Sequence, residues 1–224
     1  MPALTRSEKP MSTRTCPPNP SGPIRRASRP FVVAALCAAF VAAAPAMAQA
    51  QTVSDADTVG DMITFNDKDA VVPASERTLN DVSSTTLAHG ARRVAIAVHY
   101  VDLEKTGEFQ SLRIAMKTNE GARRDVVLAA EPQSWSGTTM MFRGNGASMR
   151  CAMRHAIDYE ANVMRVSFPR RCASSPRWVR FRIQVSAAGG GDYFADDALS
   201  DSPIGSQDSN DLARSDRVFR ETAN

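Results

Sequence analysis

Several patterns that would indicate a particular chemistry are missing from this chain of 224 residues. It contains no HExxH pair, no CxxC pair and no GxSxG motif, so it gives no support for a zinc protease, a cysteine-ligated metal or a serine hydrolase with a nucleophile elbow. Its longest apolar run is shorter than the roughly 20 residues that a membrane-spanning helix needs. After residue 50, no window of about twelve residues repeats with a helical period. These absences leave a β-rich protein without an evident reaction.

The first fifty residues are typical of a secretion signal. A basic stretch that ends at Arg29 precedes the apolar run 31–44, and small residues up to Ala48 and Ala50 provide two overlapping cleavage sites. A retained anchor, a lipoprotein signal and a twin-arginine signal fit these residues less well. We therefore expect residues 1–50 to be removed, and the rest of the chain to be secreted and to lack a membrane span.

The charge is unevenly distributed. Of 27 basic and 24 acidic residues, six and one lie in the first fifty, which leaves 21 basic and 23 acidic residues. Net charge after cleavage therefore gives no reason to expect nucleic-acid binding. The segments 51–81 and 192–224 are acidic, whereas 143–182 holds nine arginines against two acids. Either the acidic ends neutralise the arginine-rich face, or the arginines form a specific anion site.

Two cysteines, Cys151 and Cys172, remain after residue 50. In an oxidising compartment, two cysteines on one small domain most simply pair with each other. No histidine spacing typical of a zinc site accompanies them. We therefore predict a disulfide between Cys151 and Cys172 within the domain.

Strict alternation of apolar and polar residues recurs along the chain. In its clearest example, Val94, Ile96, Val98 and Tyr100 share one face. The same alternation predicts further strands at 112–117, 125–129, 151–159, 164–168 and 179–185, and more weakly at 62–65, 82–87 and 138–142. Short alternating strands without intervening helices favour an all-β antiparallel sandwich of the jelly-roll or immunoglobulin type.

The predicted sandwich spans residues 51–188. Three glycines follow at 189–191, and the chain then becomes polar. We expect 189–224 to form an acidic segment and a polar C-terminal tail, loose from Ser200 onward.

Short motifs are spread over residues 55–197. They are Gly60-Asp61, Asn80-Asp81-Val82, Val101-Asp102-Leu103, Ile157-Asp158-Tyr159, Phe168-Pro169-Arg170 and Pro176-Arg177-Trp178. This combination resembles a group of predicted secreted proteins from high-GC bacteria, which are small β-rich domains with one cysteine pair and no assigned function. The resemblance implies secretion, a β fold and a disulfide, and it assigns no catalytic residue.

Acidic turns near both ends of the predicted sandwich suggest a cation site. Six aspartates belong to these turns: Asp55, Asp57, Asp61, Asp192, Asp196 and Asp197. Carboxylate oxygens suit Ca²⁺, which takes about six to eight oxygen ligands, although the spacing is not that of an EF-hand loop. The alternative is that both ends are solvated and bind no metal. No other cofactor is expected.

Trp178, Arg180 and Arg182 share the outward face of the last predicted strand, with Arg170 and Arg171 in the loop before it. A tryptophan beside guanidinium groups can stack on a sugar, bind an anion or contact a protein. The alternative is structural: Trp178 covers the end of the core and the arginines pair with the acidic termini.

Groups suited to catalysis are sparse. His155 falls on the inward face of its predicted strand, which favours a role in the core. The carboxylate pairs Asp102 with Glu104 and Asp158 with Glu160 leave a hydrolase open. The segment 172–178 leaves an inhibitor of secreted proteases open.

The sequence therefore favours a secreted, non-catalytic binding or adhesion module that acts at the cell envelope or in the medium, with Ca²⁺ as an optional stabiliser. Its expected partner is a cell-envelope polymer, a polysaccharide or an extracellular protein. The alternatives are a secreted carboxylate-dependent hydrolase and an inhibitor of secreted proteases.

Overall fold

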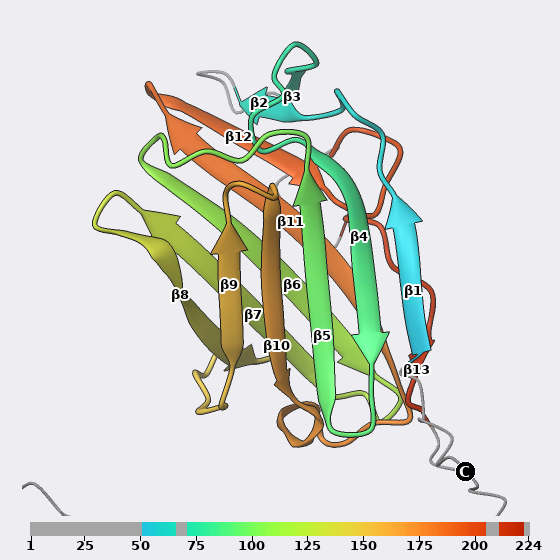
Figure 1. Ribbon diagram of the computed structural model, residues 1–224. Coiled ribbons are helices and arrows are strands. Elements are labelled where there is room, and N and C mark those ends of the chain that lie inside the picture. Colours follow the sequence, from blue (N-terminus) through green and yellow to red (C-terminus); the bar gives the residue numbers. More distant parts are fainter. Residues whose placement is uncertain (1–50, 66–70, 205–210, 222–224) are drawn as a thin grey trace, which may run out of the picture. The chain divides into compact units, whose positions relative to one another are not determined.

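Two antiparallel β-sheets pack face to face in this protein (Figure 1). The structure is a computed structural model that describes residues 51–65, 71–204 and 211–221, so the predicted signal at 1–50 lies outside the described residues. The elements in chain order are β1 (Gln51–Ala56), β2 (Ile63–Phe65), β3 (Val71–Pro73), β4 (Val82–His89), β5 (Arg93–Tyr100), β6 (Phe109–Thr118), β7 (Arg123–Glu131), β8 (Ser134–Arg143), β9 (Arg154–Asp158), β10 (Val163–Pro169), the 3-10 turn η1 (Arg170–Ala173), β11 (Trp178–Gly189), β12 (Asp192–Asp197) and β13 (Val218–Phe219). No helix among the described residues is long and apolar enough to cross a membrane.

The first sheet, sheet A, has the strand order β1-β4-β5-β10-β9. The second, sheet B, has the order β3-β2-β12-β11-β6-β7-β8, and β13 pairs with the start of β11. All of these strand pairs are antiparallel. The all-β antiparallel sandwich that the sequence predicts is therefore confirmed.

The alternating pattern decides which side chains fill the core between the sheets. Val94 and Ile96 on β5 and Phe181 and Ile183 on β11 are almost fully buried in one cluster. Complete burial of such a side chain contributes about 1.5–3 kcal/mol. Because neighbouring residues point to opposite faces of a strand, burying one set leaves the other on the outer face of each sheet.

The predicted disulfide is present. Cys151 precedes β9 and Cys172 lies in η1 directly after β10, with their Cα atoms 6.1 Å apart. The bridge thus ties the base of the β9–β10 hairpin to the loop that follows it.

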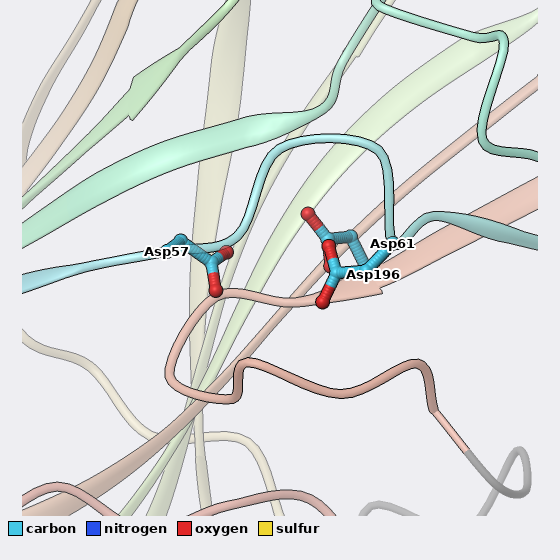
Figure 2. A group of neighbouring side chains, drawn as sticks. All are labelled: Asp57, Asp61 and Asp196. Carbon is cyan, nitrogen blue, oxygen red and sulfur yellow. The ribbon is translucent and has the colours of Figure 1, made fainter.

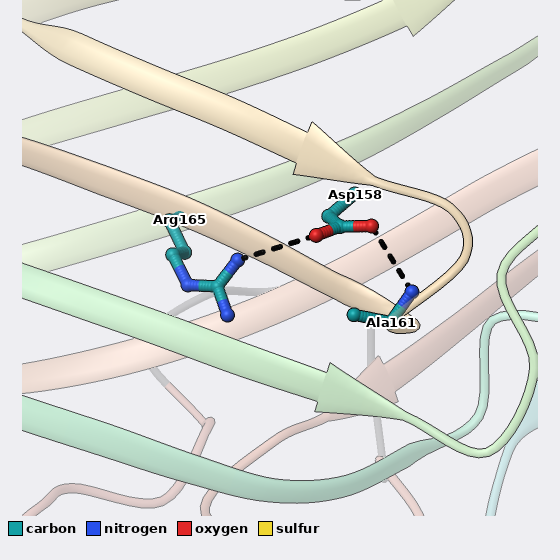
Figure 3. A network of polar contacts seen from close by, with 3 residues as sticks. All are labelled: Asp158, Ala161 and Arg165. Carbon is teal, nitrogen blue, oxygen red and sulfur yellow. Dashed lines mark hydrogen bonds and ion pairs between the residues drawn. The ribbon is translucent and has the colours of Figure 1, made fainter.

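Asp158 closes the other end of this hairpin (Figure 3). One of its carboxylate oxygens accepts a hydrogen bond from the Ala161 amide at 3.0 Å, and the other lies 4.0 Å from the Arg165 guanidinium on β10. Asn162 in the same turn has a φ of 51°, a conformation that asparagine tolerates better than most residues. The Asp158 carboxylate is therefore engaged in shaping the turn.

The edge strands β8 and β9 meet along one side of the sandwich. Gly137 on β8 has a φ of +81°, and a Cβ atom there would lie 2.9 Å from the Ile157 side chain on β9. A glycine is required for this close approach. The Tyr159 hydroxyl donates to the Trp135 carbonyl at 2.9 Å and reinforces the contact.

His155 lies on the inward side of β9, directly opposite the buried Val166 of β10, but it is not the core residue that was predicted. It is exposed on β9, with its Nε2 atom 3.1 Å from the Gly137 carbonyl oxygen. β9 is the edge strand of sheet A, where the core covers its inward side only in part, so His155 remains exposed.

The described residues after 188 belong to the sandwich. β12 pairs with both β11 and β2 and is an internal strand of sheet B. Leu212 and Val218 are buried, and β13 pairs with β11. The structure thus extends the sandwich past the predicted boundary at 188, and it shows 211–221 packed where a loose tail from Ser200 was expected. The glycines at 189–191 form a hairpin turn that brings the chain back to the sheet.

Candidate functional site

The loop between β1 and β2 carries two aspartates into the interior. β1 lies in sheet A and β2 in sheet B, so the loop crosses from one sheet to the other. Asp57 and Asp61 on this loop are only 9% and 6% exposed. Gly60, with a φ of 88°, turns the loop, and its amide donates to the Asp81 Oδ2 atom at 2.9 Å.

Asp196, on β12, lies close to Asp57 and Asp61. That strand pairs with β2 so that Ala195 faces Ile63, which puts Asp196 beside the crossing loop. Asp196 is 1% exposed. One carboxylate oxygen from each of Asp57, Asp61 and Asp196 lies within 4.8 Å of the other two. Figure 2 shows the Asp57 carboxylate directed toward those of Asp61 and Asp196. We call these three residues the aspartate cluster.

Two further buried carboxylates surround the aspartate cluster. Asp81 lies directly before β4 and is fully buried. Asp197 is buried beside Asp196, but its oxygens accept hydrogen bonds from the Leu199 and Ala213 amides. The interior at this end of the sandwich therefore holds five aspartates.

Burial makes these carboxylates weak acids. Burial first, and then the nearby carboxylates of Asp196 and Asp61, raise the pKa of Asp57 to about 9. Burial likewise raises the pKa of Asp196 to about 8 and that of Asp61 to about 6, again with neighbouring aspartates adding to the effect. Burial also raises the pKa of Asp81 and Asp197. The fold thus disfavours the ionised cluster unless a positive charge accompanies it.

The structure gathers part of the predicted cation site. Three of the six predicted aspartates form the aspartate cluster, and Asp197 is adjacent but bound to backbone amides. Asp55 is half-buried on β1, where burial and then Asp216 raise its pKa, and Asp192 is exposed at the start of β12. The sequence prediction missed Asp81, whose position just before an alternating strand was the available signal.

A second cluster, of positive charge, lines a groove of about 460 Å³ on the outer face of sheet B. Its basic side chains are Arg113, Lys117, Arg123, Arg124, Arg180, Arg182, Arg214 and Arg217. Among the described residues, Asp125 is the only acidic side chain in the lining. We call this surface the basic groove.

Strand register aligns three of these cations in one row. Arg180 on β11 is directly opposite Lys117 on β6, and Lys117 is directly opposite Arg123 on β7. Side chains in such positions have their Cβ atoms about 4.5–5.5 Å apart, and like charges there destabilise the sheet. We call Arg180, Lys117 and Arg123 the cationic row.

Other groove residues already have partners. Arg113 lies 3.6 Å from Asp125. Arg124 donates to the Cys172 carbonyl at 3.0 Å and so connects the groove to the disulfide. The Arg217 guanidinium lies 4.9 Å from the centre of the half-buried Trp178 ring, so one face of the indole is covered.

The groove differs from the predicted contact surface at two points. Arg170 and Arg171 lie in η1 and do not line it. Arg214 and Arg217 do line it, and they come from the segment that was expected to be loose. That segment is held to β11 because Phe181 donates to the Ser215 hydroxyl at 3.0 Å and Ser215 donates to the Phe181 carbonyl at 2.9 Å.

The fold and these two sites define a class of protein: a disulfide-tied β-sandwich with buried aspartates at one end and a basic groove on one outer face. Comparisons with protein-family models, with curated proteins and with solved structures gave no match.

Proposed function

We propose that the protein is a secreted, non-catalytic binding module whose basic groove binds an anionic polymer at the cell envelope or in the medium. The cationic row is the observation that carries this proposal. Three directly opposed cations on adjacent strands oppose sheet stability. A ligand that bears negative charge would relieve their repulsion.

The composition of the groove supports an anion as the ligand. Lys117 and Arg123 are exposed, and no acidic side chain among the described residues forms an ion pair with the cationic row. Guanidinium groups bind carboxylate, sulfate and phosphate through paired hydrogen bonds. The half-buried Trp178, which lines the groove, can contact a sugar ring beside these anions.

The shape of the groove favours a chain over a compact ligand. Its lining extends over β6, β7, β11 and the segment that carries Arg214 and Arg217, and it lies on the open face of a sheet. A linear polysaccharide that carries carboxylate, sulfate or phosphate groups can contact several of these strands at once. We therefore propose an acidic polysaccharide as the partner.

The two alternative functions have less support. The Asp158 carboxylate, a candidate for hydrolysis, is engaged with Ala161 and Arg165 (Figure 3). The candidate inhibitory segment contains the turn η1, followed by Ser174 and Ser175 with φ of 69° and 53°, so it does not present an extended backbone to a protease.

Co-sedimentation with insoluble polymers tests the proposal. The purified protein is mixed with an acidic polysaccharide, a neutral polysaccharide and a cell-wall preparation, each in Ca²⁺ and in chelator. We expect pelleting with the acidic polymer, which weakens as salt rises from about 0.05 to 0.5 M because screening shortens the range of the charges. Lys117→Glu should weaken pelleting about tenfold or more, since it reverses the centre of the cationic row.

Arg92→Glu is the matched control, because it makes the same charge change at an exposed turn between β4 and β5 of sheet A. It should leave binding unchanged. Failure to pellet with every acidic polymer, or equal losses in Lys117→Glu and Arg92→Glu, would contradict the proposal. Binding to DNA as tight as to the polysaccharide would contradict the assigned polymer class.

A further inference from the structure

We propose that the aspartate cluster is a Ca²⁺ site that joins the loop between β1 and β2 to β12. This inference is independent of the proposed function, because the cluster lies in the interior and the basic groove on the outer face of sheet B.

Unpartnered oxygens are the first observation that points to a cation. Neither carboxylate oxygen of Asp57 or of Asp61 has a hydrogen-bond partner among the described residues, and both side chains are more than nine-tenths buried. The Oδ1 atom of the fully buried Asp81 also lacks a partner. Buried acceptors without donors carry a large desolvation cost. A bound cation would remove that cost for several oxygens together.

A second observation comes from neutral side chains nearby. The Tyr100 hydroxyl, on a residue only 5% exposed, has no hydrogen-bond partner among the described residues, and the charge of Asp196 helps to raise its pKa after burial. The Asn80 Oδ1 atom, on the residue that precedes Asp81, is likewise buried and has no partner among the described residues. Neutral oxygens without partners are therefore buried in this part of the fold together with the carboxylates.

The charged side chains around the aspartate cluster do not neutralise its carboxylates. Every charged group that shifts the pKa of Asp57 or Asp61 is another aspartate. Within the described ranges, no basic side chain therefore balances the cluster. A divalent cation supplies that balance.

The donor set and its spacing indicate which cation fits. All candidate ligands are oxygens, which favour hard cations over zinc or copper. Two oxygens on one Ca²⁺, each at about 2.3–2.6 Å, lie up to about 5 Å apart, whereas two on Mg²⁺ lie at most about 4.2 Å apart. The cluster oxygens lie within 4.8 Å of one another, a spacing that the larger ion, Ca²⁺, can span with a small adjustment of the side chains.

A cation here would fasten the two sheets together. Asp57 follows β1 of sheet A, while Asp61 and Asp196 belong to the part of the chain in sheet B. The bound ion would thus stabilise the crossing loop directly. We expect its removal to lower the stability of the folded protein.

Thermal unfolding of the purified protein, first freed of metal with EDTA, tests the site. We expect Ca²⁺ at about a hundredfold above its Kd to raise Tm by about 5–10 °C, and Mg²⁺ at the same concentration to raise it less. Tb³⁺, which replaces Ca²⁺ at oxygen sites, should bind and show luminescence on excitation of Tyr100. Calorimetric titration of Ca²⁺ into the unaltered protein should show one site.

Three variants separate a metal site from a merely structural cluster. Asp57→Asn should raise Tm in EDTA at pH 7, because folding no longer requires a carboxylate that is ionised in the unfolded chain to take up a proton, and it should abolish the Ca²⁺ shift. Asp61→Asn should lose the Ca²⁺ shift in the same way and serves if Asp57→Asn fails to fold. Asp192→Asn makes the same change at an exposed aspartate outside the cluster and should keep the full shift.

Absence of any Ca²⁺ shift together with absence of calorimetric binding would overturn the proposal. So would a full Ca²⁺ shift in Asp57→Asn and Asp61→Asn. An equal shift with Mg²⁺ would contradict the assignment of Ca²⁺.

Discussion

The aspartate cluster and the basic groove both concentrate charge of one sign, and they differ in access to water. The carboxylates of Asp57, Asp61 and Asp196 lie inside the sandwich, whereas Lys117 and Arg123 of the cationic row are exposed. In the interior, desolvation raises the pKa of every carboxylate in the cluster. On the surface, water and salt weaken the repulsion between like charges.

This difference in exposure to water suggests different roles for the aspartate cluster and the basic groove. Buried charges of one sign require compensation for the fold itself to be stable, so the aspartate cluster is assigned to an ion. Exposed charges of one sign are tolerated and can attract a ligand, which is why we propose the basic groove as the binding surface.

The hairpin of β11 and β12 connects the two regions. β11 carries Arg180 on its outer face, and β12 ends at Asp196 and Asp197. Asp197 accepts a hydrogen bond from the Ala213 amide, at the start of the segment that takes Arg214 to the basic groove. The positions of both charged regions therefore depend on one hairpin.

Removal of the disulfide is the largest expected perturbation. Cys151→Ala with Cys172→Ala should lower the free energy of unfolding by about 3 kcal/mol, because the closed loop of 21 residues no longer restricts the unfolded chain. Denaturant unfolding measures this loss. The basic groove should weaken as well, since Arg124 donates to the Cys172 carbonyl, while the Ca²⁺ shift persists. If the double variant loses both the Ca²⁺-induced rise in Tm and polymer binding, the two regions do not act separately.

A smaller effect concerns His89, whose imidazole would carry a positive charge in the interior if it were protonated. His89 is fully buried at the end of β4, where its Nδ1 lies 3.1 Å from the Val218 carbonyl oxygen. Burial lowers its pKa, and the positive charges of Arg170 and Arg220 lower it further, against the effect of that hydrogen bond. Below about pH 6.5 the unfolded chain therefore binds a proton that the folded chain resists. The stability that neutral His89 provides is present above this pH and is lost as the pH falls below it.

Stability measured against pH for His89→Asn checks this expectation, because asparagine keeps a donor for the Val218 carbonyl and does not titrate. The variant should lack the part of the acid destabilisation that wild type shows below pH 6.5. His99→Asn, at a half-buried histidine on β5, is the control and should follow wild type. Identical acid profiles for wild type and His89→Asn would show that burial of this group carries no such penalty.

Local pattern accounts for what the sequence predicted correctly. Alternation in 94–100 and 179–185 identified β5 and β11 with their buried faces, because it depends only on neighbouring residues. The disulfide followed from the count of two cysteines. Asp57, Asp61 and Asp196 were among the six aspartates of the predicted cation site, because acidic turns near both ends of the sandwich can be recognised locally.

Long-range register accounts for what the sequence could not give. The alignment of Arg180, Lys117 and Arg123 depends on which strands pair and in what register, and no local pattern contains that information. Arg214 joins the groove because Ser215 binds Phe181, a contact made across 34 positions. The exposure of His155 was also missed, because no local pattern shows that its strand lies at the edge of a sheet.

Neutralising one charge in each region, side by side, tests most directly the claim that burial separates their roles. Asp57→Asn and Lys117→Gln each replace one ionisable side chain of a like-charged group by a neutral amide, and their melting temperatures are measured in chelator at pH 7. We expect Asp57→Asn to raise Tm by several degrees, because folding no longer requires protonation of this buried carboxylate, while Lys117→Gln changes Tm by less than about 2 °C. Equal shifts in the two variants, or a lower Tm for Asp57→Asn, would contradict the claim that burial separates the two roles.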